Sequence, residues 1–243
     1  MVTIGEVARY AGVSVATVSR VLNNSESVKP ATAQRVLAAI RELDYIPNQS
    51  ARNLRRSESR VILTLAPNFS NPYYSSILTG IGDLAHDCEY SVLICNTGGL
   101  AENEERFLKM LDAHRADGAI VLGCRRNNPR LSEYAQRYPV VQCCEYVPEL
   151  KQPTVSIDNY TAAAETIDYL INQGHRRIAL LSADNDFIST QQRRQGYEDV
   201  LRKAGLPCGG ELVALADADY SYASGLVAAE RLLRTEPRPT AVC

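Results

Sequence analysis

Residues 12–23 have the sequence GVSVATVSRVLN, which is typical of the turn and second helix of a helix-turn-helix. Gly12 can adopt the left-handed backbone that ends a preceding helix, and the Ser14 hydroxyl can cap the helix that follows. Upstream, Thr3 and Glu6 have the spacing of a capping box, which predicts the start of a first helix. Two helices this short cannot bury their apolar stripes alone, so we expect a third.

The third helix is predicted to begin at Pro30, which suits the first helical position, although Lys29 before it supplies no capping hydroxyl. Its apolar stripe is Ala33, Val36, Leu37, Ile40 and Leu43. This stripe can cover the apolar side chains of the first two helices, and the second helix then turns its remaining face outward. That face carries Val15, Ala16, Thr17, Ser19 and Arg20. A helical bundle that contacts another protein is the alternative interpretation.

Charge is distributed unevenly along the chain. Residues 1–60 hold nine Arg or Lys and five Asp or Glu, a net charge of +4, whereas residues 61–243 have a net charge of −6. Positive charge concentrated in one small headpiece is what contact with DNA phosphates requires. The basic helix lacks the aromatic and leucine face of a membrane-surface helix. We therefore predict double-stranded DNA, and no membrane, as the partner of this segment.

The next segment resembles a short hinge. Asn48 can cap a helix over residues 49–56, and residues 57–59 form a polar linker. Helices below about 12–15 residues are marginal in water, so this one should fold only when docked. Arginines around the lone Leu54 favour a DNA minor groove, where proteins insert apolar wedges between base steps. A charged linker with an incidental leucine is the alternative.

From Arg60 onward, short apolar runs alternate with helical patterns, which predicts an α/β fold with parallel sheets. The runs are residues 61–66, 91–95, 118–122, 140–144, 155–157, 178–182, 212–215 and 240–242. They make two Rossmann-like lobes. The predicted domains are an all-α helix-turn-helix headpiece (1–47), a hinge helix and linker (48–59), an N-lobe (60–160) and a C-lobe (161–243).

Several motifs, in this order, resemble the lac repressor (LacI/GalR) family of bacterial transcription regulators. They are residues 12–23, 45–48 and 51–54, then 71–74, 117–120, 157–159, 174–178 and 193–197. Residues 57–60, 147–150 and 153–155 look most like the cytidine repressor branch. The resemblance implies a periplasmic-binding-protein-like effector domain and a homodimer that represses by occupying a palindromic operator. The predicted DNA-binding residues are Thr3, Ser14, Val15, Ala16, Thr17, Ser19, Arg20, Asn23, Asn48, Ala51, Arg52, Leu54 and Arg55.

A small effector is expected to bind between the lobes. In open parallel sheets ligands bind beyond the carboxyl ends of the strands, where residues 67–74 lie, and Tyr73 and Tyr74 can stack on a flat base or sugar face. Ordinary packing at the helix start is the alternative for both tyrosines. By the resemblance, Asp158, Arg193 and Tyr220 also line the effector pocket. The resemblance favours a nucleoside such as cytidine; a purine base or a sugar is the alternative effector.

The family's pattern continues well beyond residues 239–242, whereas this chain stops at Cys243. We expect the second lobe to be truncated, as a fragment, a frameshifted product or an incomplete sequence. Because the family's acidic effector contact would lie in the missing stretch, a non-enzymatic small-molecule sensor that has lost regulation is the alternative function.

Other classes are disfavoured by the motifs. No dinucleotide-binding, P-loop or Gly-x-Ser-x-Gly pattern occurs, so we predict no enzyme and no cofactor. Seven cysteines, without a Cys-x-x-Cys pair, favour buried thiols over a metal site, and His175 looks structural. A periplasmic sugar-binding protein would share the two-lobed fold, but a signal peptide is not evident at the start. The expected location is the bacterial cytoplasm, at the nucleoid.

Overall fold

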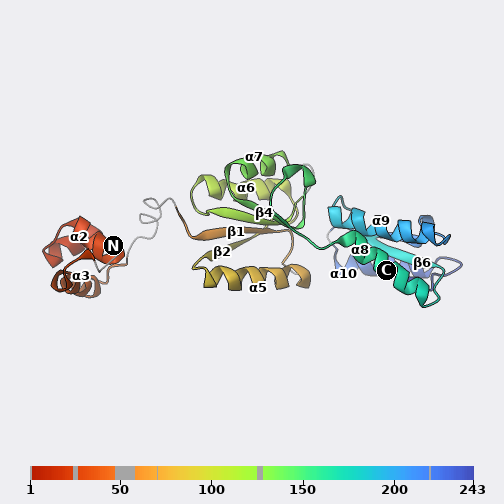
Figure 1. Ribbon diagram of the computed structural model, residues 1–243, viewed down its shortest axis with the longest axis horizontal. Coiled ribbons are helices and arrows are strands. Elements are labelled where there is room, and N and C mark those ends of the chain that lie inside the picture. Colours follow the sequence, from red (N-terminus) through yellow and green to blue (C-terminus); the bar gives the residue numbers. More distant parts are fainter. Residues whose placement is uncertain (1, 24–26, 47–57, 70, 125–127, 219) are drawn as a thin grey trace. The chain divides into compact units, whose positions relative to one another are not determined.

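A computed structural model describes residues 2–23, 27–46, 58–69, 71–124, 128–218 and 220–243 (Figure 1). The chain divides into two compact units, residues 1–57 and 58–243. We call the first the headpiece and the second the effector domain. Within the described residues, every helix is too short or too polar to cross a membrane.

The headpiece contains α1 (Ile4–Ala11), α2 (Val15–Asn23) and α3 (Pro30–Glu42). The predicted capping box is present: the Thr3 hydroxyl accepts from the Glu6 amide at 3.3 Å, and the Glu6 carboxylate accepts from the Thr3 amide at 2.7 Å. Gly12 ends α1 in the left-handed region, at φ 63°. The Ser14 hydroxyl accepts from the Thr17 amide at 3.2 Å. These confirmed features are all set by neighbours along the chain.

The headpiece core confirms most of the predicted stripe and corrects one position. Val7, Val18 and Val36 are fully buried, one from each helix. Leu37 was predicted in the stripe, but it is 44% exposed. The helical period places the residues three and four positions after Val36 on the buried face and turns the next residue away by about 100°. Ala39, 1% exposed, takes the buried place, and its small side chain allows α3 to pack closely.

The N-lobe sheet is parallel, as the alternating pattern predicted, and its five strands have the order β2-β1-β3-β4-β5. The strands are β1 (Val61–Ala66), β2 (Ser91–Asn96), β3 (Gly118–Gly123), β4 (Val140–Glu145) and β5 (Thr154–Val155). The last predicted strand was placed too far along the chain, because β5 ends at Val155 and Ile157 is 54% exposed. Only two residues of this edge strand pair with β4.

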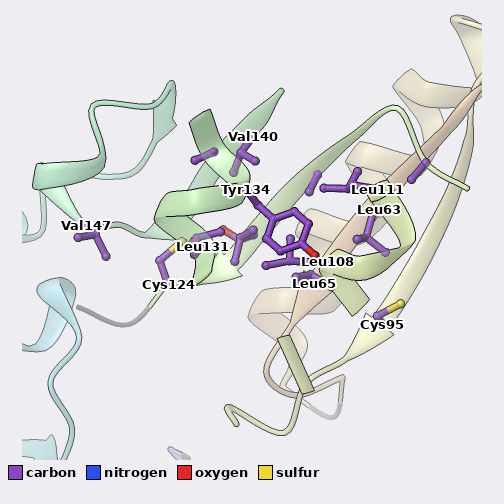
Figure 2. Packing of buried hydrophobic residues seen from close by; sticks show 14 residues of the cluster. Leu63, Leu65, Cys95, Leu108, Leu111, Cys124, Leu131, Tyr134, Val140 and Val147 are labelled. Carbon is purple, nitrogen blue, oxygen red and sulfur yellow. The ribbon is translucent and has the colours of Figure 1, made fainter. Parts of the chain in front are cut away.

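Helices cover both faces of the N-lobe sheet (Figure 1). They are α5 (Pro72–Asp87), α6 (Ala101–Asp112) and α7 (Pro129–Arg137), the last of which the sequence analysis did not identify. The main core lies between the sheet and the α6 and α7 helices, where Leu108, Leu111 and Tyr134 pack with Leu63 and Leu65 of β1 (Figure 2). On the other face α5 packs over Ala66 and Leu122. Buried faces on both sides explain why these strands are continuous apolar runs.

The C-lobe has a parallel three-stranded sheet with the order β7-β6-β8. Its elements are α8 (Asn159–Asn172), β6 (Ile178–Ala183), α9 (Ile188–Lys203), η3 (Gly210–Leu212), β7 (Val213–Ala216), α10 (Tyr222–Leu233) and β8 (Ala241–Val242). The other short 3-10 turn, η2 (Pro148–Leu150), lies between β4 and β5 of the N-lobe. Gly196 lets α9 approach α8, since a Cβ there would lie 2.6 Å from the Tyr160 carbonyl oxygen. Leu226 and Val227 on α10 are at least half exposed.

Candidate DNA interface and effector site

The α2 helix presents one buried and one exposed face. Val18 and Val21 are buried against the other two helices, whereas Val15, Ala16 and Arg20 are exposed. The exposed face is therefore the one the sequence predicted for base contact. Its short side chains leave room for a base edge, and they suit contact with thymine methyl groups.

Arg20 is the cation on this face. Among the residues that the structure describes, its guanidinium forms no hydrogen bond or ion pair. Its side chain is consequently not held by the headpiece itself. A planar guanidinium fork matches the O6 and N7 acceptors of guanine in the major groove.

The hydroxyl groups predicted on this interface are partly used inside the headpiece. Ser14 and Thr17 side chains lie 2.9 Å apart, oxygen to oxygen. The Asn23 amide donates to the Ser19 carbonyl at 2.8 Å and more weakly to the Ser19 hydroxyl at 3.4 Å. These groups shape the two ends of α2, and hydroxyl oxygens retain capacity for further hydrogen bonds. The predicted residues Asn48, Ala51, Arg52, Leu54 and Arg55 lie outside the described residues.

At the predicted effector site, the two tyrosines differ in environment. Asn71 caps α5 by accepting from the Tyr73 amide at 3.0 Å, and the Tyr73 side chain is 46% exposed. Tyr74 is only 8% exposed and belongs to the core under α5. Their rings meet edge to face, with centroids 5.5 Å apart. Tyr73 therefore offers a ring to a ligand, whereas Tyr74 supports it by packing.

Charges and dipoles from both lobes act on these tyrosines. Burial, followed by a hydrogen bond with Cys144, raises the pKa of Tyr73 to about 12, and the nearby Arg193 charge opposes that rise. Burial raises the pKa of Tyr74 further, with contributions from Glu145 and Tyr220. The structure thus brings Tyr73, Tyr74, Arg193 and Tyr220 into one neighbourhood.

Arg193 and Tyr220 are held by residues that the sequence analysis missed. The Arg193 guanidinium donates to the Asn159 side chain at 2.8 Å, and Asn159 is 1% exposed. The Tyr220 hydroxyl shares a hydrogen bond with Thr190, which also donates to Asn185 at 2.7 Å. Tyr220 itself has a φ of 54°, in the left-handed region. These contacts fix the position of the Arg193 guanidinium and of the Tyr220 phenol.

Asp158 has a separate role in the structure. Its carboxylate caps α8, accepting from the Thr161 amide at 3.0 Å and from the Thr161 hydroxyl at 2.7 Å. These two bonds lower the pKa of Asp158. The adjacent residue, Asn159, is the one that reaches Arg193.

Glu145, the last residue of β4, is a further residue that the sequence analysis missed. It is 6% exposed, and its carboxylate accepts from the Ser189 hydroxyl at 2.5 Å and from the Ser189 amide at 3.2 Å. The bond joins the N-lobe to the start of α9, and Gln192 donates to Tyr146 at 3.1 Å beside it. A polar residue directly after an apolar strand was the signal that could have identified Glu145.

In the part that the structure describes, no three His, Cys, Asp or Glu side chains are grouped so that they could bind a metal ion. Cys95, Cys124, Cys143 and Cys144 are buried, whereas Cys88 is exposed. The His175 ring lies 3.0 Å from the Thr240 hydroxyl and joins the starts of β6 and β8, which is a structural role.

Comparison with known proteins identifies both units. Residues 3–48 match the model for bacterial regulatory proteins of the lacI family, and residues 59–243 match the model for periplasmic binding proteins and the sugar-binding domain of the LacI family. The chain is 37% identical to the HTH-type transcriptional repressor CytR of Escherichia coli K12, over 99% of this chain and 70% of that protein. It is 33% identical to catabolite control protein A of Priestia megaterium, over 99% and 73% of the two chains.

Solved structures agree with this assignment. The lac repressor dimer bound to operator and the anti-inducer ONPF has a TM-score of 0.84 at 25% identity, over 99% of this chain and 72% of that one. The cellobiose complex of the transcriptional regulator CelR has a TM-score of 0.67 at 30% identity, over 100% and 73%. In this chain, the headpiece and the effector domain each match a family model, and the whole chain is similar to complete repressors. The chain therefore belongs to the lacI family of DNA-binding transcription regulators.

Proposed function

We propose that the chain represses transcription as a homodimer on a palindromic operator, with a nucleoside such as cytidine as its effector. The observation that carries the DNA part is the exposed α2 face, where Arg20 is unengaged among the described residues and Val15 is 43% exposed. The headpiece also carries the positive charge that phosphate contact needs. Two copies would place two α2 helices in successive major grooves.

The effector part rests on the neighbourhood of Tyr73, Tyr74, Arg193 and Tyr220. A half-exposed phenol ring can stack on a pyrimidine, and a guanidinium held by Asn159 can donate to a base carbonyl or a ribose hydroxyl. The resemblance of residues 57–60, 147–150 and 153–155 to the cytidine repressor branch favours a nucleoside, and a sugar, which the CelR structure binds as cellobiose, is the alternative. Asp158 stays a candidate at the rim, with its carboxylate already capping α8.

Control of DNA binding is proposed to act through the segment at residues 48–56. An effector that binds one arrangement of the lobes more tightly shifts the population toward it, and the shift is limited by the difference in affinity between the two arrangements. If the hinge helix folds only in the minor groove, a shift between the two lobe arrangements can change the affinity for the operator. The protein would act in the cytoplasm, at the nucleoid.

Selection of bound sites from random DNA by the full chain tests the proposal, with and without cytidine, a purine base or a sugar. Palindromic enrichment that changes with cytidine supports it, and the absence of enrichment would refute the DNA-binding part. Arg193→Ala should remove the cytidine response. Arg194→Ala is the matched control, because Arg194 pairs with Glu198 at 2.8 Å and should leave the response intact.

A further inference from the structure

The strand β4 carries an irregularity at two adjacent cysteines. Gln142 pairs with Val121 and Glu145 pairs with Gly123, so β4 uses one residue more than β3 over the same stretch. Cys144 adopts a φ of 67°, in the left-handed region that residues other than glycine rarely occupy. Such local strain is commonly found at functional positions.

The bulge brings both cysteine side chains together. In a regular strand, successive side chains point to opposite faces of the sheet. Here Cys143 and Cys144 both join the core under α5, and their sulfur atoms lie 3.7 Å apart. The left-handed residue therefore converts two thiols that would face apart into a vicinal dithiol.

Adjacent residues make an unusual disulfide. Neighbouring Cα atoms are about 3.8 Å apart across a trans peptide, which is shorter than the span of about 4.4–6.8 Å in ordinary disulfides. A bond across that span is strained. Strained disulfides are reduced more readily than structural ones, and they are the reversible, regulatory kind.

The surroundings favour a reactive sulfur at Cys143. The sulfur atoms of Cys143 and Cys144 lie within hydrogen-bond distance, at 3.7 Å, and this contact lowers the pKa of Cys143. The thiolate is the nucleophile in thiol chemistry. Cys143 and Cys144 are 9% and 6% exposed, so the surrounding core limits the access of reagents to both thiols.

We propose that Cys143 and Cys144 are a peroxide-sensitive modification site that closes to a reversible vicinal disulfide. The Cys143 thiolate attacks one oxygen of hydrogen peroxide; the O–O bond breaks, leaving a sulfenic acid and hydroxide. The Cys144 sulfur then attacks the Cys143 sulfur, the S–O bond breaks, and water leaves with the Cys144 proton. Two thiols are oxidised and one peroxide is reduced, and a dithiol reductant reverses the change.

Cys124 provides a matched comparison within the same lobe. It is 2% exposed at the end of β3, and its thiol donates to the Val121 carbonyl at 3.7 Å. Burial raises the pKa of Cys124. It has no adjacent cysteine in the sequence, so it should stay reduced where the vicinal pair reacts.

The test treats the full chain with hydrogen peroxide, blocks the remaining thiols and measures tryptic peptides by mass spectrometry. Cleavage at Arg137 and Lys151 isolates a peptide whose only cysteines are Cys143 and Cys144. We expect this peptide to lose two hydrogen atoms, to take up no blocking reagent, and to recover both thiols with dithiothreitol. Cys124→Ser should give the same result. Cys144→Ser should leave a sulfenic acid at Cys143 that dimedone traps.

The measurement on the unsubstituted chain decides the outcome, even if a variant folds poorly. Two blockable thiols in the 138–151 peptide, at a peroxide dose that oxidises the exposed Cys88, would overturn the proposal. A disulfide from Cys143 to Cys124 would overturn it as well. Because the readout is the covalent state of sulfur, it does not depend on operator binding or on the effector.

Discussion

The headpiece and the effector domain organise their sites over different distances along the chain. The hydrogen bonds that set the ends of α2 join Ser14 to Thr17 and Ser19 to Asn23, three and four residues apart. At the effector site, besides local caps, several hydrogen bonds join residues 30 to 46 positions apart, such as Thr190 to Tyr220 and Gln192 to Tyr146. The first site is therefore built by one short segment, whereas the second requires the whole effector domain to fold.

The substitution with the largest expected effect should unfold the headpiece and leave the effector domain folded. Val36→Asp places an unpaired carboxylate in the headpiece core, where the side chain is fully buried, and should cost several kcal/mol. We expect the headpiece to unfold and residues 58–243 to keep their structure, as amide hydrogen exchange can measure. Leu37→Asp, at a position that is 44% exposed, is the control and should leave both units folded. Joint unfolding in Val36→Asp would show that the units depend on each other.

A second substitution tests the long-range contacts of the effector domain. Glu145→Ala leaves the buried Ser189 hydroxyl and amide without their acceptor and should reduce the free energy of unfolding of that domain by about 1–3 kcal/mol. Urea denaturation followed by circular dichroism measures it. Glu149→Ala, an exposed glutamate on η2, should change stability little. If the two variants had equal effects on stability, the stabilising role of the contact between Glu145 and Ser189 would be contradicted.

The smallest expected effect is a pH dependence of the stability of the headpiece. Hydrogen bonds from the Thr3 amide, and next from its hydroxyl, lower the pKa of Glu6 below its ordinary 4.5. The stabilisation is present above pH 4.5 and is lost as the pH falls through the lowered pKa of the folded state. The stability difference between the unsubstituted chain and Glu6→Gln should thus shrink on acidification. A difference that stays constant from neutral to acidic pH would contradict the capping role.

The difference between local contacts in the headpiece and long-range contacts in the effector domain explains which features could be predicted from the sequence. The caps at Thr3, Gly12 and Ser14, and the parallel pairing of strands in an α/β fold, follow from local residue patterns and from the geometry of parallel connections. Asn159, Glu145 and Thr190 could not be linked to Arg193, Ser189 and Tyr220, because no local pattern specifies a contact thirty or more residues away. Leu37 was misplaced because a stripe at three- and four-residue spacing leaves the choice between neighbouring positions to the packing of the other helices.

The vicinal cysteines illustrate a further limit. Adjacent cysteines in an apolar strand predict side chains on opposite faces, since strands alternate. The bulge that joins Cys143 and Cys144 depends on the register between β4 and β3, which the sequence of β4 alone does not contain. Tertiary pairing, rather than residue preference, created this pair.

The central claim is that α2 recognises bases through Arg20, and the most direct measurement is the affinity of Arg20→Ala for the selected operator and for operators with single base changes. We predict a loss of roughly 1–3 kcal/mol on the matched operator and relaxed preference at one position in each half-site. Arg41→Ala removes the same charge from the end of α3 and should weaken all sequences alike. If Arg20→Ala also weakened every sequence equally, the base-recognition role of Arg20 would be contradicted.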